Sequence, residues 1–229
     1  MNTLQDIQHA IGQLPFGERV TLLEWVLESS PLSYHVAESA PAYAAAPAGV
    51  SFMTVDEYLK WEEHSPINHE YIAGQIFAMT TPVLRHQAIL GNLHAAFHAH
   101  LKGGPCKAYV SNIKVQLKVD RADIVYCPDV LVACGPQEME QPIPQDSRLI
   151  VEVLSPSTQS IDRREKLLNY RFIPSLEEYV IVAQRTQCVT VHRRSEEWRP
   201  IVAEAPDAGV EFRSIGLTLA LASLYEGTL

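Results

Sequence analysis

The sequence predicts an α/β domain in which helices cover the faces of a mixed β-sheet. Three observations predict this class: short apolar runs typical of buried strands, one long segment with apolar side chains at helical spacing, and a second helical segment that separates two groups of strands. The chain has 229 residues, 47% of them hydrophobic, which is enough for the core of one ordinary domain with a small appendage.

The first fifty residues differ from the rest in composition. Residues 4–29 carry two apolar stripes at helical spacing, separated at Leu14-Pro15, and predict a helical hairpin. Residues 31–50 consist mainly of Ala and Pro with few large side chains, which is typical of a semi-extended linker. We therefore divide the chain into an N-terminal helical extension over 1–30, an Ala/Pro-rich linker over 31–50 and the main domain over 51–229.

The main domain begins with clear local signals. Thr54 followed by Glu57 has the pattern of a capping box and predicts a short helix, and residues 69–79 alternate around a turn and predict a hairpin. Residues 84–101 repeat apolar side chains every four positions and predict a helix with one buried face. The remaining pattern predicts strands over 108–119, 122–134 and 148–154, a helix over 160–173, and strands over 177–183, 188–194 and 198–205.

Charge, hydropathy and cysteine usage exclude several classes. A net charge of −9 argues against nonspecific nucleic-acid binding over the whole surface, although a local basic groove stays possible. No apolar run reaches transmembrane length and the N-terminus lacks the pattern of a signal peptide, so we expect a cytoplasmic protein without a membrane contact. The four cysteines show neither a CxxC pair nor zinc-like spacing, and we expect reduced thiols: Cys106, Cys127, Cys134 and Cys188.

Two acidic residues stand where apolar side chains are expected. Glu152 interrupts the run "LIVEVL", and an ionised carboxylate in a buried strand is costly unless a cation or strong donors meet it. Asp129 follows Pro128 at the start of the run "VLVA", near a strand end. Neighbouring strands would place the two carboxylates a few ångströms apart, which disfavours joint ionisation unless a divalent cation lies between them. An oxygen-only pair suits Mg²⁺ or Mn²⁺ better than zinc.

The following helix offers a cation to the same place. Asp162, Lys166 and Tyr170 recur four residues apart and share one face, with Asp162 and Glu165 in a capping pattern at the helix start. Two carboxylates, a divalent cation and an ammonium group suit attack of a metal-activated water on a phosphodiester. Tyr170 itself we interpret as a core residue that packs the helix.

The motifs "CPD", "VEVLSPST" and "DRREKLLNY" together resemble the PD-(D/E)XK nuclease superfamily. The nearest branch is a restriction-endonuclease-like family of unknown function that is abundant in cyanobacteria, and the resemblance runs from about Met53 to Leu224. Many superfamily members carry the Lys two residues after the Glu, where this chain has Leu154; in this branch the Lys lies on the next helix, which matches Lys166.

The resemblance implies a restriction-endonuclease-like fold and a Mg²⁺- or Mn²⁺-dependent enzyme that hydrolyses DNA. It implies the catalytic set Glu70, Asp129, Glu152 and Lys166, with Asp129, Glu152 and Glu70 as metal ligands. His86, in the motif "RHQ", is implied at the rim of the substrate site. Cleavage of both strands of a duplex favours a homodimer.

Two departures from the family pattern keep a second function open. Ala73 and Gln75 stand where the family has an acidic hairpin, and "YVIVAQ" replaces "YWIVD". The chain could therefore be a catalytically weak or inactive nuclease-fold protein with a binding or regulatory role. Residues 14–29 also resemble the short helical components of bacterial addiction modules, which would make them a contact for a protein partner, although packing on the domain or on a second subunit is the simpler interpretation.

Several basic and histidine residues have both a functional and a structural interpretation. Arg163 and Arg164 could bind substrate phosphates, lie on a solvated helix face, or pair with Glu152 as a buried salt bridge, and the Arg193-Arg194 pair could also contact phosphates or lie at a solvated strand end. His94 and His98 have a spacing that can bind zinc, but no third ligand motif accompanies them, which favours an ordinary helix face.

Overall fold

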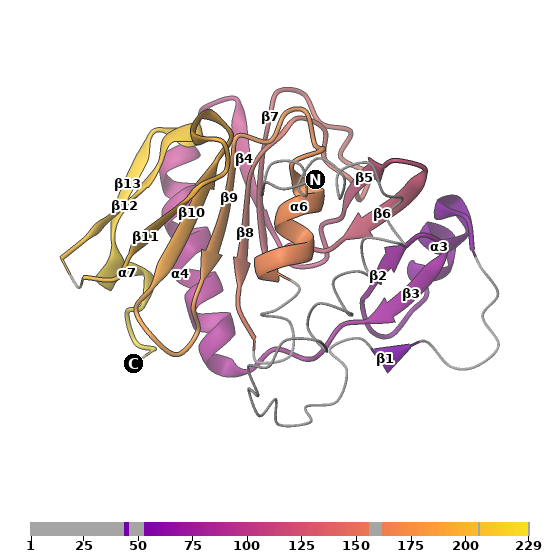
Figure 1. Cartoon of the computed structure of the whole chain (residues 1–229), viewed down its shortest axis with the longest axis horizontal. Helices are drawn as coiled ribbons and strands as arrows, with labels where there is room; N and C mark the ends of the chain where they lie inside the picture. Colours follow the sequence, from indigo (N-terminus) through magenta and orange to yellow (C-terminus); the bar gives the residue numbers. More distant parts are fainter. Residues whose placement is uncertain (1–43, 46–52, 156–161, 206, 229) are drawn as a thin grey trace, which may run out of the picture.

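The computed structural model describes residues 44–45, 53–155, 162–205 and 207–228 (Figure 1). The predicted helical extension over 1–30 and the predicted linker, apart from strand β1 (Ala44–Ala45), lie outside the described residues. Among the described helices, none is both long and apolar enough to span a membrane.

A six-stranded mixed sheet forms the centre of the molecule. Its strands lie in the order β11–β10–β9–β8–β7–β4, with β8 and β9 parallel and the other neighbours antiparallel. The predicted fold class is therefore confirmed. The strands are β4 (Cys106–Val110), β7 (Val130–Cys134), β8 (Ser147–Val153), β9 (Glu178–Val182), β10 (Val189–Arg193) and β11 (Pro200–Ala203).

A second sheet lies beside the first, on the right in Figure 1. Its order is β1–β3–β2–β6–β5, and the predicted hairpin over 69–79 supplies two of its strands. The sequence pattern did not predict a third, two-stranded sheet near the C-terminus. The remaining strands are β2 (His69–Ile72), β3 (Gln75–Ala78), β5 (Val115–Val119), β6 (Ala122–Tyr126), β12 (Gly209–Phe212) and β13 (Leu217–Ala220).

Two of the helices begin where the sequence predicts them, and the short C-terminal helix was not predicted. Helix α3 (Val55–Glu62) carries the capping box, in which Thr54 and Glu57 bond each other's backbone amides. Helix α4 spans Leu84–Leu101 with its predicted apolar face buried. The predicted helix over 160–173 is a π-helical turn, η1 (Asp162–Lys166), that continues as α6 (Leu167–Tyr170), and a last short helix is α7 (Leu221–Leu224).

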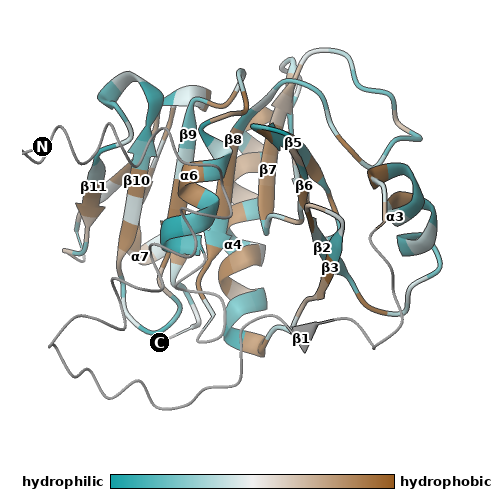
Figure 2. Cartoon of the chain, turned by 45° about the vertical axis from the view of Figure 1, so that its right-hand side comes forward, coloured by the Kyte–Doolittle hydropathy of each residue, from teal (hydrophilic) through white to brown (hydrophobic). Residues whose placement is uncertain are grey.

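The two faces of the central sheet have different cover. Helix α4 packs behind the sheet in Figure 1 against Val151 and Val153, whereas α6 packs in front of it on the side of Ile150 and Leu154. Hydrophobic strands between these layers, β7 among them, form the core visible in Figure 2. Because side chains alternate along a strand, Glu152 faces the α6 layer with Ile150 and Leu154.

The predictions of two strands were wrong in the same way, because each predicted strand is divided into two in the structure. The run 108–119 is not one strand but β4 and β5, which belong to different sheets, and the run 122–134 is likewise divided into β6 and β7. The first break occurs at Ser111 and Asn112, which both have positive φ angles, 54° and 63°, that a strand cannot accommodate. The second occurs at Cys127–Asp129, where Pro128 lacks the amide that a continuous ladder needs.

The prediction of four reduced thiols was also wrong. Cys106 and Cys134 form a disulfide, while Cys127 and Cys188 are free thiols. The pairing of β4 with β7 places Cys106 directly opposite Cys134. The two cysteines are 28 residues apart in sequence, so only the strand register reveals their contact.

Candidate active site

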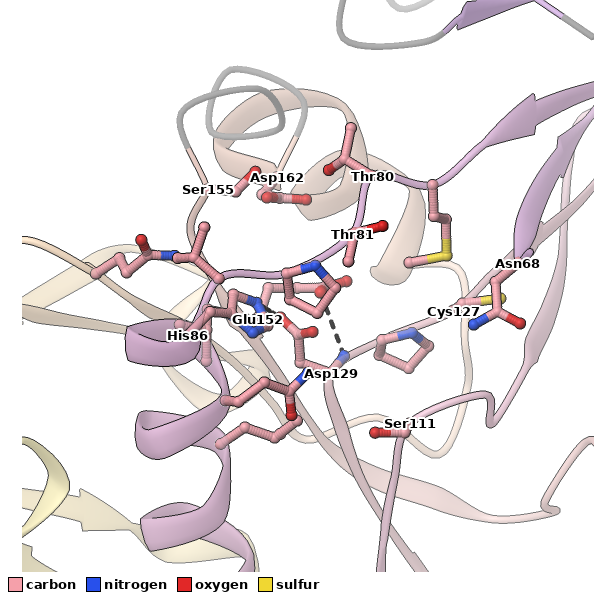
Figure 3. A pocket seen from close by; sticks show the side chains of 18 of the residues that line it. Asn68, Thr80, Thr81, His86, Ser111, Cys127, Asp129, Glu152, Ser155 and Asp162 are labelled. Atoms are coloured by element: carbon pink, nitrogen blue, oxygen red, sulfur yellow. Dashed lines mark hydrogen bonds and ion pairs between the residues drawn. The ribbon is translucent and has the colours of Figure 1, made fainter. Parts of the chain in front are cut away.

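A pocket of about 1050 Å³ opens where the two large sheets meet. The chain crosses from the central sheet to the second sheet between β4 and β5, and crosses back between β6 and β7. Both crossings line the pocket, the first with Ser111 and Asn112 and the second with Cys127, Pro128 and Asp129. The strand breaks that the sequence did not predict are therefore the features that open the site (Figure 3).

Asp129 and Glu152 are held against each other by backbone bonds. The Asp129 amide donates to Oε2 of Glu152 at 3.4 Å, and the Val153 amide donates to Oδ2 of Asp129 at 2.7 Å. The antiparallel register that pairs Val130 with Val151 fixes this arrangement, since the two acids immediately flank the pair. The predicted proximity of the two carboxylates is confirmed.

Lys166 is the cation that pairs with Glu152, the acid buried in strand β8. Its Nζ lies 3.0 Å from Oε1 of Glu152, 2.9 Å from Oε1 of Glu70 and 3.2 Å from Oδ1 of Asp162. The lysine comes from the last position of the π-helical turn η1, and such turns are frequent at functional sites. Glu70 comes from β2 and also accepts a bond from the Cys127 amide at 3.3 Å. Residues from both sheets and from η1 thus converge on one ammonium group.

The charges in this cluster do not balance. Three buried carboxylates surround one buried ammonium group, and Asp129 adds a fourth acid beside them. Burial raises the pKa of Glu152 well above its usual range; Lys166 opposes this effect, and Asp162, Asp129 and Glu70 add to it. Burial alone would lower the pKa of Lys166, but the surrounding carboxylates outweigh it and raise that pKa, so the amine stays charged.

Two further residues of the site were not in the predicted catalytic set. Tyr170, predicted as a core residue, is fully buried and also donates from its hydroxyl to Oε1 of Glu152 at 3.0 Å. Asp162, predicted only as a cap, pairs with Lys166. Their spacing from Lys166 by four residues in each direction was the signal that places all three on one side of the helical segment.

His86 lies deeper than the rim position that was predicted. It is buried in the first turn of α4, and its Nε2 lies 3.2 Å from Oδ2 of Asp129 (Figure 3). Burial lowers the pKa of His86, but the bond and the charge of Asp129 outweigh burial and raise that pKa above its ordinary value. The histidine therefore holds one oxygen of Asp129 in place.

Comparisons with known proteins agree with this architecture. The Uma2 family, described as "Putative restriction endonuclease", matches residues 55–222. The chain belongs to the Uma2 family. That match includes all four predicted catalytic residues, Glu70, Asp129, Glu152 and Lys166.

Two curated relatives and one solved structure resemble this Uma2 protein. The uncharacterized protein slr1290 of Synechocystis sp. is 36% identical over 179 residues, which are 76% of this chain and 92% of that protein. The uncharacterized protein sll1609 of the same organism is 26% identical over 170 residues, covering 72% and 95%. The crystal structure of "a putative nuclease belonging to DUF820" from Anabaena variabilis has a TM-score of 0.63 and 23% identity, and covers 77% of this chain and 99% of that one. The predicted restriction-endonuclease-like fold is confirmed.

The arginines predicted to bind substrate lie away from the pocket of this Uma2 protein. Arg163 and Arg164 are exposed and do not line it, and the predicted pairing of either with Glu152 is wrong because Lys166 takes that place. Arg193 is buried against Glu178 at 2.8 Å, and Arg194 donates to the carbonyls of Leu176 and Ile173. The Arg193-Arg194 pair is therefore structural in this Uma2 fold.

A zinc site is not formed by the helix histidines. The rings of His94 and His98 are 5.8 Å apart, and Nε2 of His100 lies 2.8 Å from the Ile215 carbonyl. Within the part of the chain that the structure describes, no three His, Cys, Asp or Glu side chains form a ready set of metal ligands.

The acid cluster of the Uma2 site explains why no ready three-ligand set exists there. Lys166 lies among Glu70, Glu152 and Asp162, where a cation shared by all three would have to lie. The interlocked pair Asp129 and Glu152 supplies two carboxylates that open to the pocket. Mg²⁺ commonly binds one or two protein carboxylates and keeps several waters, so this oxygen pair fits it.

Proposed function

We propose that this Uma2 protein is a Mg²⁺- or Mn²⁺-dependent endonuclease that hydrolyses phosphodiester bonds of DNA. The observation that carries the proposal is the interlocked Asp129–Glu152 pair that lines the pocket, with the buried Lys166 beside it. Two carboxylates that can bind a divalent cation, and one fixed ammonium, suit the hydrolysis of a phosphodiester by a metal-activated water. The family description and the nuclease-like fold support the same reaction class.

In this proposal Asp129 and Glu152 hold the divalent cation. When bound, the cation would lower the pKa of a water molecule and screen the negative charge of the phosphate. His86 and the Val153 amide both bond Oδ2 of Asp129, which orients the carboxylate toward the pocket. Tyr170 orients Glu152 in the same way, because its hydroxyl donates to Oε1 of Glu152.

Lys166 is proposed to stabilise the phosphate as its charge develops. Glu70 and Asp162 hold the ammonium in position at 2.9 and 3.2 Å, so we assign Glu70 to the lysine and not to the metal, although the sequence predicted it as a metal ligand. The three N–H groups of the ammonium already face three carboxylates, so Lys166 would act on the phosphate through its fixed positive charge, which needs no reorganisation during the reaction.

Cleavage assays test the proposal directly. Purified protein is incubated with plasmid and short DNA substrates in Mn²⁺, Mg²⁺ or EDTA. We expect cleavage with either metal and none in EDTA. Glu152→Gln and Asp129→Asn should each abolish it, and calorimetric titration should show that Asp129→Asn also removes weak Mn²⁺ binding. Unchanged Mn²⁺ binding by Asp129→Asn would place the metal elsewhere.

A binding protein without turnover is the second candidate. Lys166 already bonds Glu152 and Glu70, which reduces the negative charge available to a metal, and the β2–β3 hairpin has Ala73 and Gln75 in place of the family's acids. This candidate requires DNA binding without cleavage in every metal tested. Cleavage by the wild type that disappears in Glu152→Gln excludes it.

Assembly as a homodimer remains part of the proposal. A single pocket cuts one strand, and two copies related by a twofold axis would present two pockets to a duplex. Sedimentation velocity should show a dimer in the presence of duplex DNA, whereas a monomer that still makes double-strand breaks would contradict this assembly.

A further inference from the structure

The rim of the pocket carries an unusual concentration of exposed apolar side chains. Of the eight large hydrophobic residues that are exposed in the described part of the chain, three line this pocket: Ile67, Val83 and Leu84. Leu84 is 91% exposed, the highest value among the eight. Exposed apolar groups gathered at one place mark a binding surface more often than groups scattered singly.

A proline precedes each of the two exposed apolar segments, Ile67 and the Val83–Leu84 pair, which we call the two tips. Pro66 precedes Ile67, and Pro82 precedes Val83 and Leu84. The fixed φ angle of proline limits the movement of each tip, so the apolar side chains are presented in a preset direction. The segment that carries Thr80 and Thr81 leads into the helix of His86 (Figure 3), and Val83 and Leu84, which lie between Thr81 and His86, line the same pocket as the acids.

The residues at the start of α4 are not those that a helix N-terminus prefers. Val83 occupies the N-cap position, where Ser, Thr, Asp or Asn would bond a free amide, and it makes no side-chain cap bond. Leu84, the first helical residue, is exposed to solvent. Local sequence choices that oppose the local structure are expected at functional sites. The Val-Leu tip has no role in the described fold that would justify both features.

The cations near the rim are few. Arg85 and Arg185 are exposed and line the pocket, and Arg85 is anchored by a bond from its Nε to the Thr228 carbonyl at 2.9 Å. Two guanidinium groups can bind the phosphates of a short strand, but a long duplex needs a larger basic surface than a chain of net charge −9 offers.

We propose that the apolar rim formed by Ile67, Val83 and Leu84 inserts beside an unstacked base, so that this enzyme prefers DNA with unpaired nucleotides at the cut site. Aliphatic side chains cannot bind the phosphates that an intact duplex presents, but they act as wedges between bases that have lost their stacking. Arg85 and Arg185 bind the flanking phosphates, and the carboxylates lie below. The inference rests on the proposed nuclease function and specifies its substrate class.

The test replaces the wedge without weakening the fold. Val83→Thr introduces a side chain that can cap α4, and Leu84→Gln keeps the length of a side chain that is already in solvent. Met139→Gln is the matched control, because Met139 is 77% exposed and lies outside the pocket lining. Thermal melts should show that none of the three variants is less stable than the wild type.

Three substrates of one sequence are compared with Mn²⁺: a single strand, a duplex with a mismatch at the cut site, and a perfect duplex. We expect the wild type and Met139→Gln to cut the first two at least about tenfold faster than the third, in kcat/KM. The Val83→Thr/Leu84→Gln double variant should lose about tenfold on the unpaired substrates and little on the perfect duplex. Equal rates on all three substrates, unchanged in the double variant, would overturn the wedge.

A second measurement separates the wedge from catalysis. The fluorescence of 2-aminopurine in a single strand rises when the base unstacks, and it is recorded in EDTA, where no cleavage is expected. We expect a rise with the wild type and Met139→Gln and none with the double variant. If the wild type cuts no DNA, the nuclease proposal fails, and this fluorescence alone decides the wedge. Substitutions that change sedimentation and leave the fluorescence rise intact would assign the rim to a second copy of the chain and overturn the inference.

Discussion

Glu152 shares its cation partner, Lys166, with two other buried acids. Glu152→Gln keeps an oxygen for the bonds from Lys166 and Tyr170, while it removes one of four neighbouring acids that repel one another when ionised. Lys166 retains Glu70 and Asp162. We therefore expect the metal-free variant to be as stable as the wild type or slightly more stable, and to lose the stabilisation that Mn²⁺ gives. Thermal melts of both proteins with and without Mn²⁺ measure this, and a large loss of stability without metal would mean that Glu152 is a structural acid.

Removal of Lys166 should have the opposite effect. Lys166→Met leaves Glu70, Glu152 and Asp162 buried without their shared ammonium, and we expect a loss of about 3–5 kcal/mol in the free energy of unfolding. Mn²⁺ should restore more stability to this variant than to the wild type. Lys118→Met is the control, because its pair with Asp123 is exposed and contributes at most about 1 kcal/mol. If Lys166→Met and Lys118→Met lose the same free energy of unfolding in urea, the interpretation that Lys166 stabilises a buried cluster is contradicted.

The bond between His86 and Asp129 predicts a pH dependence. The pKa of His86 in the folded protein is raised above its ordinary value of 6.5, so protonated His86 stabilises the fold below that pH. The contribution is lost as the pH rises through the folded pKa. Between pH 6 and pH 8 the metal-free wild type should therefore lose more stability than His86→Gln. His98→Gln, on the exposed face of the same helix, should follow the wild type in urea unfolding at both values.

At the scale of elements, Arg193 forms a buried ion pair that joins two strands, although the sequence suggested this arginine as a phosphate contact. Arg193 of β10 bonds Glu178 of β9 and donates to the Glu211 carbonyl of β12 at 2.7 Å, so it fastens the small C-terminal sheet to the central one. Arg193→Met should destabilise the fold by about 3–5 kcal/mol, because Glu178 stays buried without its cation. The Mn²⁺-dependent rise in melting temperature should be unchanged. Arg199→Met, which breaks an exposed pair, should alter neither quantity.

At the scale of the whole molecule, periodic patterns predicted the elements and left their assembly open. The apolar repeat of α4 and the apolar run of β8 around Glu152 are local signals, so both elements were predictable. The crossings at Ser111–Asn112 and at Pro128 were not, because a run of strand-forming residues has the same pattern whether it stays in one sheet or changes sheet. The disulfide between Cys106 and Cys134 depends on register, which no linear spacing contains.

The site was predictable where a residue contradicted its surroundings. Glu152 in an apolar strand and Asp129 behind a proline were conspicuous, and the next helix offered Lys166. Asp162 and Tyr170 were harder to assign, because acids and tyrosines are ordinary at a helix start and in a core. Only the folded structure shows that Asp162 pairs with Lys166 and that the hydroxyl of Tyr170 bonds Glu152.

The domain division makes a prediction about the whole chain. Every described residue of the acid cluster lies between Glu70 and Tyr170, and the described core clusters of the central sheet extend from Ile89 to Tyr225. We therefore expect that neither needs residues 1–43. A chain that begins at Ala44 should therefore fold and show the full Mn²⁺-dependent rise in melting temperature. A chain that begins at Met53 also loses β1, which pairs with β3 in the structure. Strand β3 then becomes the edge of the second sheet. This shorter chain should keep the Mn²⁺ response but associate more readily in sedimentation experiments, because an uncovered edge strand offers free backbone groups. Loss of the Mn²⁺ response in the chain from Ala44 would show that the N-terminal segment belongs to the active site and not to an appended contact for a partner.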